Sequence, residues 1–213
     1  MPRNAAKEKH CMLKIRNIEK NIVKLLDKVY SSKDISHRAE IDFNETRRRK
    51  FQEGYYLFTI QEAGNESHGI VIEKRLTSTG KERFYLFDPN GQKWANTSAY
   101  HIKISHSRKL HDPIISLSPK KSWNPMGYCG LWCIVMVIFF NSIKEEPDDV
   151  RPFVASDTKK LYKYMNKHGS AFIKEIYTNL IEKSRKNYTT QSETMLFIEA
   201  VLERLIVILH NLD

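Results

Sequence analysis

Residues 124–140 read NPMGYCGLWCIVMVIFF, and this stretch decides the fold. From Leu131 to Phe140 it has no charged residue, glycine or proline, which predicts about three turns of a helix buried on all sides. Cys129 precedes this run in a Gly-Tyr-Cys-Gly turn, so we expect it at a helix N-terminus. There, unpaired backbone N–H groups and the helix dipole favour the thiolate, which is the form that attacks a carbonyl carbon. Cys129 is therefore a candidate nucleophile that needs a base.

Other interpretations of this stretch are less specific. A cysteine beside an apolar run is often a small core residue, and that alternative stays open. A membrane span is disfavoured because the uncharged segment opens with Asn, Pro and Gly residues, leaving an apolar core well short of the ~20 residues needed. Metal binding by Cys129 and Cys133 is disfavoured because Cys11 is the only other cysteine, so no second pair exists. We expect no metal site.

Length and composition favour one principal domain. The 213 residues, 41% of them hydrophobic, can bury a sizeable core, and we place that domain at residues 51–213, after a basic helical N-terminal extension at residues 1–50. The 3 cysteines, an odd number, argue against a disulfide framework and for a reducing compartment. The polar N-terminus lacks the apolar core of a secretory signal. We expect a soluble intracellular monomer that is neither secreted nor attached to a membrane.

The basic charge is uneven along the chain. Of the net charge of +10, residues 1–50 carry +7, from 14 Lys and Arg against 7 Asp and Glu. The densest cluster is Arg47, Arg48, Arg49 and Lys50. Such clusters suit polyanions, above all nucleic acid, through phosphate contacts and counterion release. No nucleic-acid-binding motif accompanies the cluster, so an ordinary solvated basic face is the alternative.

Hydrophobic periodicity gives the order of the remaining elements. Residues 8–30 carry apolar residues at alternating spacings of four and three, which predicts an amphipathic helix packed on its own domain. Aromatic and β-branched runs predict strands at 55–60, 69–72 and 83–87, with a turn at 76–81 and further candidates at 100–104 and 114–117. Helices are predicted at 157–167, ending at Gly169, at 171–183 and at 192–210. A helix, a mainly antiparallel sheet and then helices make an α+β fold.

A base for Cys129 is found at the strand ends. His68 directly precedes one predicted strand, and Asp88 directly follows the next. If these strands form a hairpin, both side chains lie at the same end of the sheet. That arrangement suits an imidazole whose second nitrogen is held by a carboxylate. Each residue alone is more often a turn or surface group, but the matched pair followed by a cysteine is more specific.

These residues resemble a known family. His68, the segment FYLFDPNG at 84–91 and YCGLWC at 128–133 are similar to adenain, the maturation protease family of adenoviruses, with relatives in other DNA viruses and virophages. The wider clan includes proteases that remove the ubiquitin-like protein SUMO. The similarity covers residues 54–180, and its most specific part is the Cys-Gly-Leu-aromatic-Cys motif.

The resemblance implies a papain-like cysteine protease, with a central sheet packed on a buried nucleophile helix. Cys129 would be the nucleophile, His68 the base and then the acid, and Asp88 the carboxylate that orients His68. Its substrates would be viral capsid and core precursor proteins, cleaved in the virion and the infected host cell. The chemistry would need no cofactor, while activation by DNA or by a viral peptide is left open. Viral DNA is the partner that the basic cluster suggests.

The sequence departs from the family pattern in two places near the site. Gly69 stands where the family usually has Trp, so His68 would lose a stacking neighbour. The family's oxyanion-hole Gln is missing, because no Gln occurs between Gln92 and Gln191. Asn124 could donate in its place together with the backbone N–H of Cys129. Ser122 and the indole of Trp123 are lesser candidates.

Two other functions remain alternatives. A protease that removes ubiquitin-like proteins would use the same three residues. A nucleic-acid-binding virion protein without activity, on a degenerate protease fold, would explain both the charge and the missing Gln. An orienting role for Asn90 in place of Asp88 also stays open, since some members of the clan use Asn.

Overall fold

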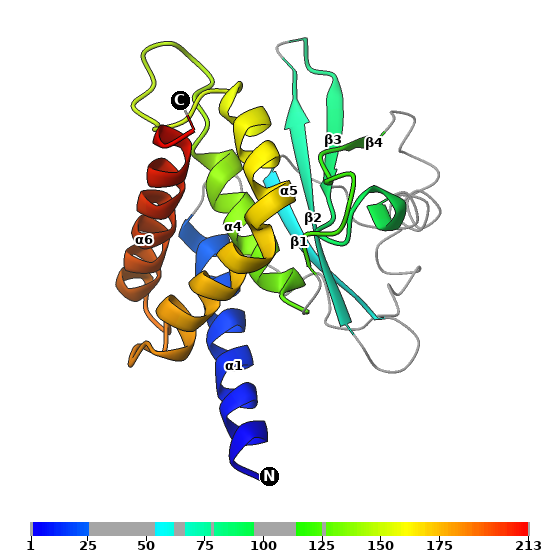
Figure 1. The fold of residues 1–213 in the computed structure, drawn as a ribbon. Coiled ribbons are helices and arrows are strands. Elements are labelled where there is room, and N and C mark those ends of the chain that lie inside the picture. The colour runs from blue at the N-terminus through cyan, green and yellow to red at the C-terminus, as the bar shows by residue number, and fades with distance from the viewer. Residues whose placement is uncertain are drawn as a thin grey trace. The chain divides into compact units, whose positions relative to one another are not determined.

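The computed structural model describes residues 2–25, 54–61, 67–77, 79–95, 114–124 and 127–212. Over these residues the fold is α+β, with a mixed four-stranded sheet and several helices (Figure 1). The chain divides into two compact units, one formed by Leu26–Cys133 and the other by Met1–Leu25 with Ile134–Asp213. The predicted strand at 100–104 lies outside the described residues. The predicted boundary at residue 50 also lies outside them and stays a prediction.

The sheet belongs to the unit Leu26–Cys133. Its strands are β1 (Gly54–Gln61), β2 (Ser67–Leu76), β3 (Glu82–Phe87) and β4 (Ile114–Ser116), in that spatial order. The first three are antiparallel, and β4 runs parallel to β3. The predicted hairpin turn is confirmed, because the Thr77 N–H donates to the Lys81 carbonyl oxygen (2.9 Å) and the Gly80 N–H to the Thr77 oxygen (2.8 Å). The strand predictions within the described residues are confirmed, with ends that differ by a few residues.

An aromatic cluster joins the end of β3 to the first turn of helix α4 (Cys129–Asn141). The Phe87 and Trp123 ring centroids are 6.0 Å apart, and those of Trp123 and Trp132 are 5.2 Å apart. The Trp132 indole N–H also donates to the Trp123 carbonyl oxygen (3.2 Å), which satisfies a buried donor. These three rings therefore connect the end of β3, next to Asp88, to the helical turn that starts at Cys129.

Helix α4 confirms the prediction made from its sequence. It begins at Cys129, and every residue from Leu131 to Phe140 is buried. Cys133, one turn after Cys129, is buried as well, whereas Cys129 is half-buried. No helix in the described part of the chain is both long and apolar enough to cross a membrane.

The other unit contains the first helix, α1 (Pro2–Leu25). The predicted amphipathic stripe is confirmed as far as the helix is described, with Cys11, Ile15, Ile18 and Ile22 all buried. The pattern did not predict that two polar residues of α1 are buried too. Lys14 Nζ donates to the carbonyl oxygens of Ile181 (3.1 Å) and Ser184, and Asn21 Nδ2 donates to the Tyr188 carbonyl oxygen (2.6 Å) and to Thr194 Oγ1 (3.1 Å). Both side chains donate to backbone carbonyl oxygens that would otherwise be buried without a hydrogen-bond partner.

Three helical segments follow α4 in this unit: α5 (Asp157–Ile176), the π-helical η2 (Tyr177–Glu182) and α6 (Gln191–His210). The predicted break at Gly169 is wrong, because α5 continues through it. Gly169 lies on the same buried face as Leu161, Met165 and Phe172, so packing offsets the cost of about 1 kcal/mol for glycine inside a helix. A capping box at Thr190 and Glu193 starts α6.

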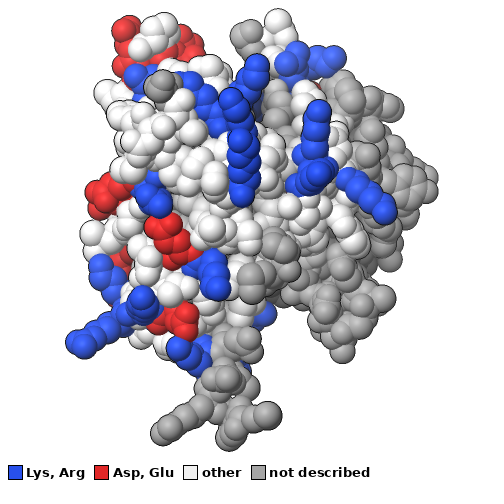
Figure 2. Space-filling view, in the orientation of Figure 1, with Lys and Arg blue, Asp and Glu red and all other residues white. Residues whose placement is uncertain are grey.

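Positive charge is spread over the described surface. On the face shown in Figure 2, Lys and Arg side chains stand separately, with Asp and Glu between some of them. Lys159, Lys163 and Lys167 are exposed at spacings of four along α5. The predicted nucleic-acid cluster Arg47–Lys50 lies outside the described residues, so its role stays a prediction.

Glu19 of α1 gives the stability of its unit a pH dependence. Burial raises the pKa of this carboxyl group to about 7, against the pull of Arg16 and Lys20. Because the folded state keeps a proton that the unfolded chain loses near pH 4.5, wild type should lose stability as the pH rises from about 4.5 to 7. Glu19→Gln should therefore be more stable than wild type at pH 8, by roughly 1 to 3 kcal/mol, and no more stable at pH 4. Urea unfolding at both pH values measures this, and an equal difference at both would contradict it.

Candidate active site

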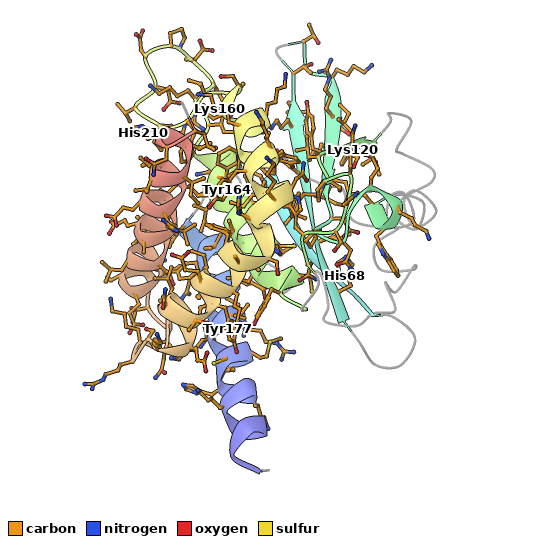
Figure 3. The ribbon with its side chains drawn as sticks, in the orientation of Figure 1. His68, Lys120, Lys160, Tyr164, Tyr177 and His210 are labelled. Atoms are coloured by element: carbon orange, nitrogen blue, oxygen red, sulfur yellow. The ribbon has the colours of Figure 1, made fainter. Side chains whose placement is uncertain are left out.

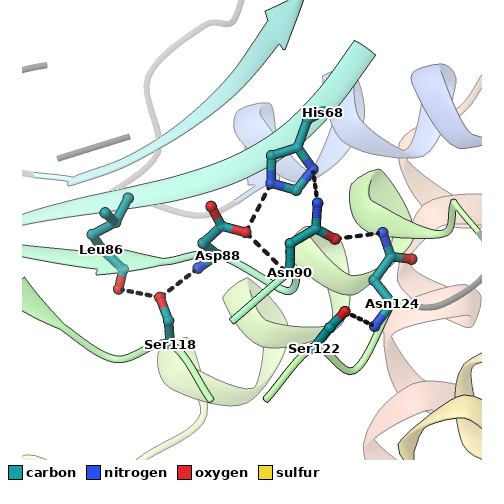
Figure 4. Close-up of polar contacts among 7 residues, drawn as sticks. All are labelled: His68, Leu86, Asp88, Asn90, Ser118, Ser122 and Asn124. Atoms are coloured by element: carbon teal, nitrogen blue, oxygen red, sulfur yellow. Dashed lines mark hydrogen bonds and ion pairs between the residues drawn. The ribbon is translucent and has the colours of Figure 1, made fainter. Parts of the chain in front are cut away.

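The hairpin brings His68 and Asp88 together. His68 is the second residue of β2, and Asp88 directly follows β3, whose last residue, Phe87, pairs with Val71. His68 Nε2 and Asp88 Oδ1 are 2.8 Å apart (Figure 4), with side-chain exposures of 6% and 0%. Figure 3 labels His68 in the whole chain. Since a buried carboxylate accepts and does not donate, Nε2 carries the proton of this hydrogen bond. The tautomer of neutral His68 is thereby fixed, and Nδ1 is left for other chemistry.

Asp88 is held by its own turn and by a neighbouring loop. The Asn90 backbone N–H donates to Asp88 Oδ1 (2.8 Å), and the Asp88 backbone N–H donates to Ser118 Oγ (2.8 Å) (Figure 4). The Gly91 N–H donates to the Asp88 carbonyl oxygen (3.1 Å), which closes the Asp-Pro-Asn-Gly turn. No sequence pattern indicated Ser118, because its contact with Asp88 depends on the pairing of β4 with β3. These bonds hold the carboxylate in place independently of its contact with His68.

Gly91 is required by the packing of this turn. Its φ of +95° is in the region that favours glycine. A Cβ there would also lie 3.0 Å from the backbone of Lys121 and Ser122. The turn and the loop before α4 can approach this closely only because no side chain separates them.

Cys129 lies within hydrogen-bonding reach of His68. Its sulfur interacts with the imidazole and with the backbone N–H groups of Gly69 and Gly130. Burial alone would raise the pKa of the thiol, but the hydrogen bonds from His68, Gly69 and Gly130 and the charge of His68 together lower it. The two backbone N–H groups donate to the sulfur, and the imidazole does so when Nδ1 carries a proton, so all three stabilise the thiolate over the thiol.

The pKa of His68 moves in the opposite direction. Burial alone would lower it, but hydrogen bonds to Asp88 and Cys129, with the negative charge of both, raise it to about 9. A raised pKa on the imidazole and a lowered one on the thiol favour transfer of the thiol proton to His68. The pair can therefore rest as imidazolium and thiolate near neutral pH.

The structure explains why Gly69 follows the histidine. A Cβ at this position would lie 3.2 Å from the Cα and the nitrogen of Gly130, which is tighter than ordinary contact. Glycine lets β2 approach the start of α4 closely enough for its N–H to reach the sulfur. An aromatic neighbour comes instead from Trp94, in a helical turn at residues 92–95, whose ring centroid is 6.5 Å from that of His68. Trp94 is 44% exposed, and sequence reasoning missed it.

Two amides continue the network beyond the imidazole. Asn90 Nδ2 lies 3.2 Å from His68 Nδ1, and Asn124 Nδ2 donates to Asn90 Oδ1 (3.1 Å) (Figure 4). Asn124, predicted as an oxyanion-hole donor, is thus brought into the site with its amide nitrogen bonded to Asn90. Its Oδ1 is buried and has no hydrogen-bond partner in the described part of the chain. Of the lesser candidates, Ser122 accepts the Asn124 backbone N–H (3.1 Å), and Trp123 is buried in the aromatic cluster.

The site is therefore built from His68, Asp88, Cys129 and the two amides, and Cys11 and Cys133 are buried elsewhere. Among the residues that the structure describes, no three His, Cys, Asp or Glu side chains gather to hold a metal ion. Such an arrangement can transfer a proton from sulfur to nitrogen beside a helix N-terminus and present a thiolate to an electrophilic carbon.

Comparison with known proteins adds no relative. No protein-family model matches the chain, and no curated protein does. Function is therefore inferred from the geometry of the site and from the motifs in the sequence.

Alkylation tests the paired state of Cys129 and His68 without any substrate. With iodoacetamide, Cys129 should react at pH 6 almost as fast as at pH 8, because the thiolate persists while His68 stays protonated below about pH 9. His68→Ala should slow the reaction at pH 6 about tenfold or more, since the thiol regains an ordinary pKa. Mass spectrometry of peptides locates the label, and buried Cys133 is the control within the same chain. Equal rates in both proteins at pH 6 would contradict the pairing.

Proposed function

We propose that this protein is a cysteine endopeptidase in which Cys129, His68 and Asp88 carry the reaction. The observation that carries the proposal is one imidazole placed between a fully buried carboxylate and a thiol at a helix N-terminus. Each part of this arrangement suits nucleophilic attack: the carboxylate orients the base, the base takes the proton, and the helix start stabilises the thiolate. An ordinary core cysteine would need none of these partners.

In the proposed reaction, Nδ1 of His68 takes the Cys129 proton because Nε2 is bonded to Asp88. The thiolate forms a C–S bond with the scissile carbonyl carbon, and the negative charge moves to the carbonyl oxygen. The imidazolium then protonates the leaving amine as the C–N bond breaks. Water attacks the thioester, with His68 as base, and releases the acid and the thiol. The backbone N–H of Cys129 and the amide of Asn124 are the proposed donors to the oxyanion.

The adenain resemblance supplies the proposed biological setting. It rests on the segments 84–91 and 128–133 and on the order His68, Asp88, Cys129, and the α+β fold is compatible with it. A papain-like arrangement of sheet and nucleophile helix is part of the proposal. The enzyme would cleave viral capsid and core precursors in the virion or the infected cell, with DNA or a viral peptide as a candidate activator.

Cleavage of precursor proteins tests the proposal. Wild type should create new N-termini in the structural proteins encoded beside its gene, mapped by mass spectrometry, whereas Cys129→Ala should create none. Cys133→Ala is the matched control and should stay active, because its sulfur is buried one turn away. The free energy of unfolding of both variants should lie within about 1 kcal/mol of that of wild type, because a thiol contributes only a small packing term.

Three outcomes would count against this proposal in different ways. Activity that survives Cys129→Ala would remove the proposed nucleophile. Activity lost only in Cys133→Ala would move the nucleophile by one turn. Cleavage of a reporter linked through Gly-Gly to a ubiquitin-like protein, in preference to the precursors, would assign the same site to deconjugation.

The orienting residue can be tested separately. Asp88→Asn should lower kcat/KM by about a hundredfold or more, because an amide no longer fixes the tautomer or stabilises the imidazolium. Asn90→Ala should lower it less, since the backbone N–H that holds Asp88 remains. Peptide hydrolysis measured across pH 5 to 10 gives both values. The reverse ranking would make Asn90 the orienting group.

A further inference from the structure

Asn90 and Asn124 form a short chain of amides that ends on the nitrogen through which His68 would do its chemistry. Asn90 Nδ2 faces His68 Nδ1 at 3.2 Å, and Asn90 Oδ1 accepts from Asn124 Nδ2 at 3.1 Å. At the far end, Asn124 Oδ1 is buried and has no partner among the described residues. A buried polar atom without a partner is destabilising, so its presence beside a site calls for a reason.

The observed orientation fits only one protonation state of His68. Because Nε2 donates to Asp88, neutral His68 has a lone pair on Nδ1, which can accept from the Asn90 amide nitrogen. When Nδ1 takes the Cys129 proton, it becomes a donor and then faces another donor at 3.2 Å. That contact is repulsive, and a half-turn of the Asn90 amide relieves it by presenting Oδ1 to the imidazolium, whose Nδ1–H is then shared between Asn90 Oδ1 and the Cys129 sulfur.

The half-turn forces the same change on Asn124. Once Asn90 turns its nitrogen toward Asn124, two donors face each other there, so the Asn124 amide must present its oxygen instead. Its nitrogen then occupies the place of the buried oxygen that lacks a partner. An amide turned by half a turn keeps nearly the same shape, so neither change requires backbone motion.

We propose that Asn90 and Asn124 act as a proton-coupled amide pair, in which protonation of His68 on Nδ1 reverses both amides and turns the buried Asn124 atom from an acceptor into a donor. The proton comes from the Cys129 sulfur, where the S–H bond breaks as the N–H bond forms. Asn90 is a positioning residue in this scheme, since it acts through His68 and Asn124.

The inference rests on the proposed function and deepens it by assigning the oxyanion donor. The imidazolium and the tetrahedral oxyanion exist at the same stage of thiol proteolysis. A pair that follows the proton therefore offers an Asn124 N–H at the stage when negative charge develops, and an acceptor when His68 is neutral. A fixed glutamine, the usual donor in the resembled family, offers the same N–H at every stage.

Three groups determine the charge at His68 in the described part of the chain. Asp88 holds Nε2, Cys129 faces the imidazole, and Asn90 contacts Nδ1. The full chain with Cys129→Ala removes the titrating thiol and leaves His68 to titrate against the buried Asp88 and the amides. This variant needs no substrate, so the measurement is independent of proteolysis.

NMR titration of the full-length Cys129→Ala protein, labelled with ¹⁵N, tests the coupling. The side-chain NH₂ signals of Asn90 and Asn124 should both shift with the same midpoint pH as the imidazole nitrogens of His68. The signals of other asparagines, such as exposed Asn166, should not follow that midpoint. Asn90 and Asn124 signals that stay constant across the His68 titration would overturn the inference.

A substitution that does not contact His68 gives a second test. Asn124→Asp can only accept, so it should hold Asn90 in the reversed orientation and bind the His68 proton about tenfold more tightly. Ser122→Asp brings the same charge to the neighbouring loop outside the amide chain and should have a smaller effect. In an Asn90→Ala background, the effect of Asn124→Asp should fall to that of Ser122→Asp. If Asn124→Asp changes proton binding by His68 equally with and without the Asn90 side chain, its charge acts directly through space, and the coupling through Asn90 is overturned.

The two proposals can fail independently. Coupled titration in a protein that cleaves nothing would leave the amide pair standing and reject the protease. Proteolysis without coupled titration would support the protease and reject the amide pair. If both hold, Asn124→Ala in the otherwise native enzyme should lower kcat by about 10- to 100-fold with little change in KM, as the loss of an oxyanion donor does.

Discussion

The complete burial of the Asp88 carboxylate is the constraint on which the rest of the site depends. A carboxylate with 0% exposure is stable only if neighbouring groups replace the water it has lost. One oxygen accepts from both the Asn90 backbone N–H and His68 Nε2. The turn that supplies the first donor and the strand that supplies the second are thus fixed together. His68 cannot rotate away without depriving the buried carboxylate of one of its donors, so the bond that holds Asp88 also keeps the imidazole beside Cys129.

Close backbone approach and aromatic packing position Cys129. β2 and the first turn of α4 lie so close that a Cβ at Gly69 would be 3.2 Å from the backbone of Gly130, and both glycines supply N–H groups to the sulfur. Trp123 packs between Phe87 and Trp132, so the end of β3 next to Asp88 and the turn of Cys129 share one aromatic support. The proposed reaction needs such support because errors of about 1 Å in the placement of reacting groups are costly.

Residue patterns predicted the hairpin and the helix that bring His68, Asp88 and Cys129 together. The alternation of the strands and the Thr-Gly turn define the β2–β3 hairpin, and a hairpin puts His68 and Asp88 at one end whatever surrounds them. The uncharged run after Cys129 predicts a buried helix with that cysteine at its start. Ser118, Trp94 and the link between Asn90 and Asn124 come from segments that meet only in three dimensions, so spacing carries no sign of them. Gly169 misled the helix prediction because a glycine on a buried face and a glycine at a helix end look alike in sequence.

The buried side chains of α1 also bear on the order of events in folding. Lys14 and Asn21 bond to partners 167 to 173 residues further along the chain. Contacts of such long separation pay a high entropy of loop closure and generally form late. During synthesis, at about 5 to 20 residues per second, α1 leaves the ribosome and then waits at least several seconds for η2 and α6. Until then its apolar stripe of Cys11, Ile15, Ile18 and Ile22 lacks its final cover, so the newborn chain exposes an apolar helix face of the kind that chaperones bind.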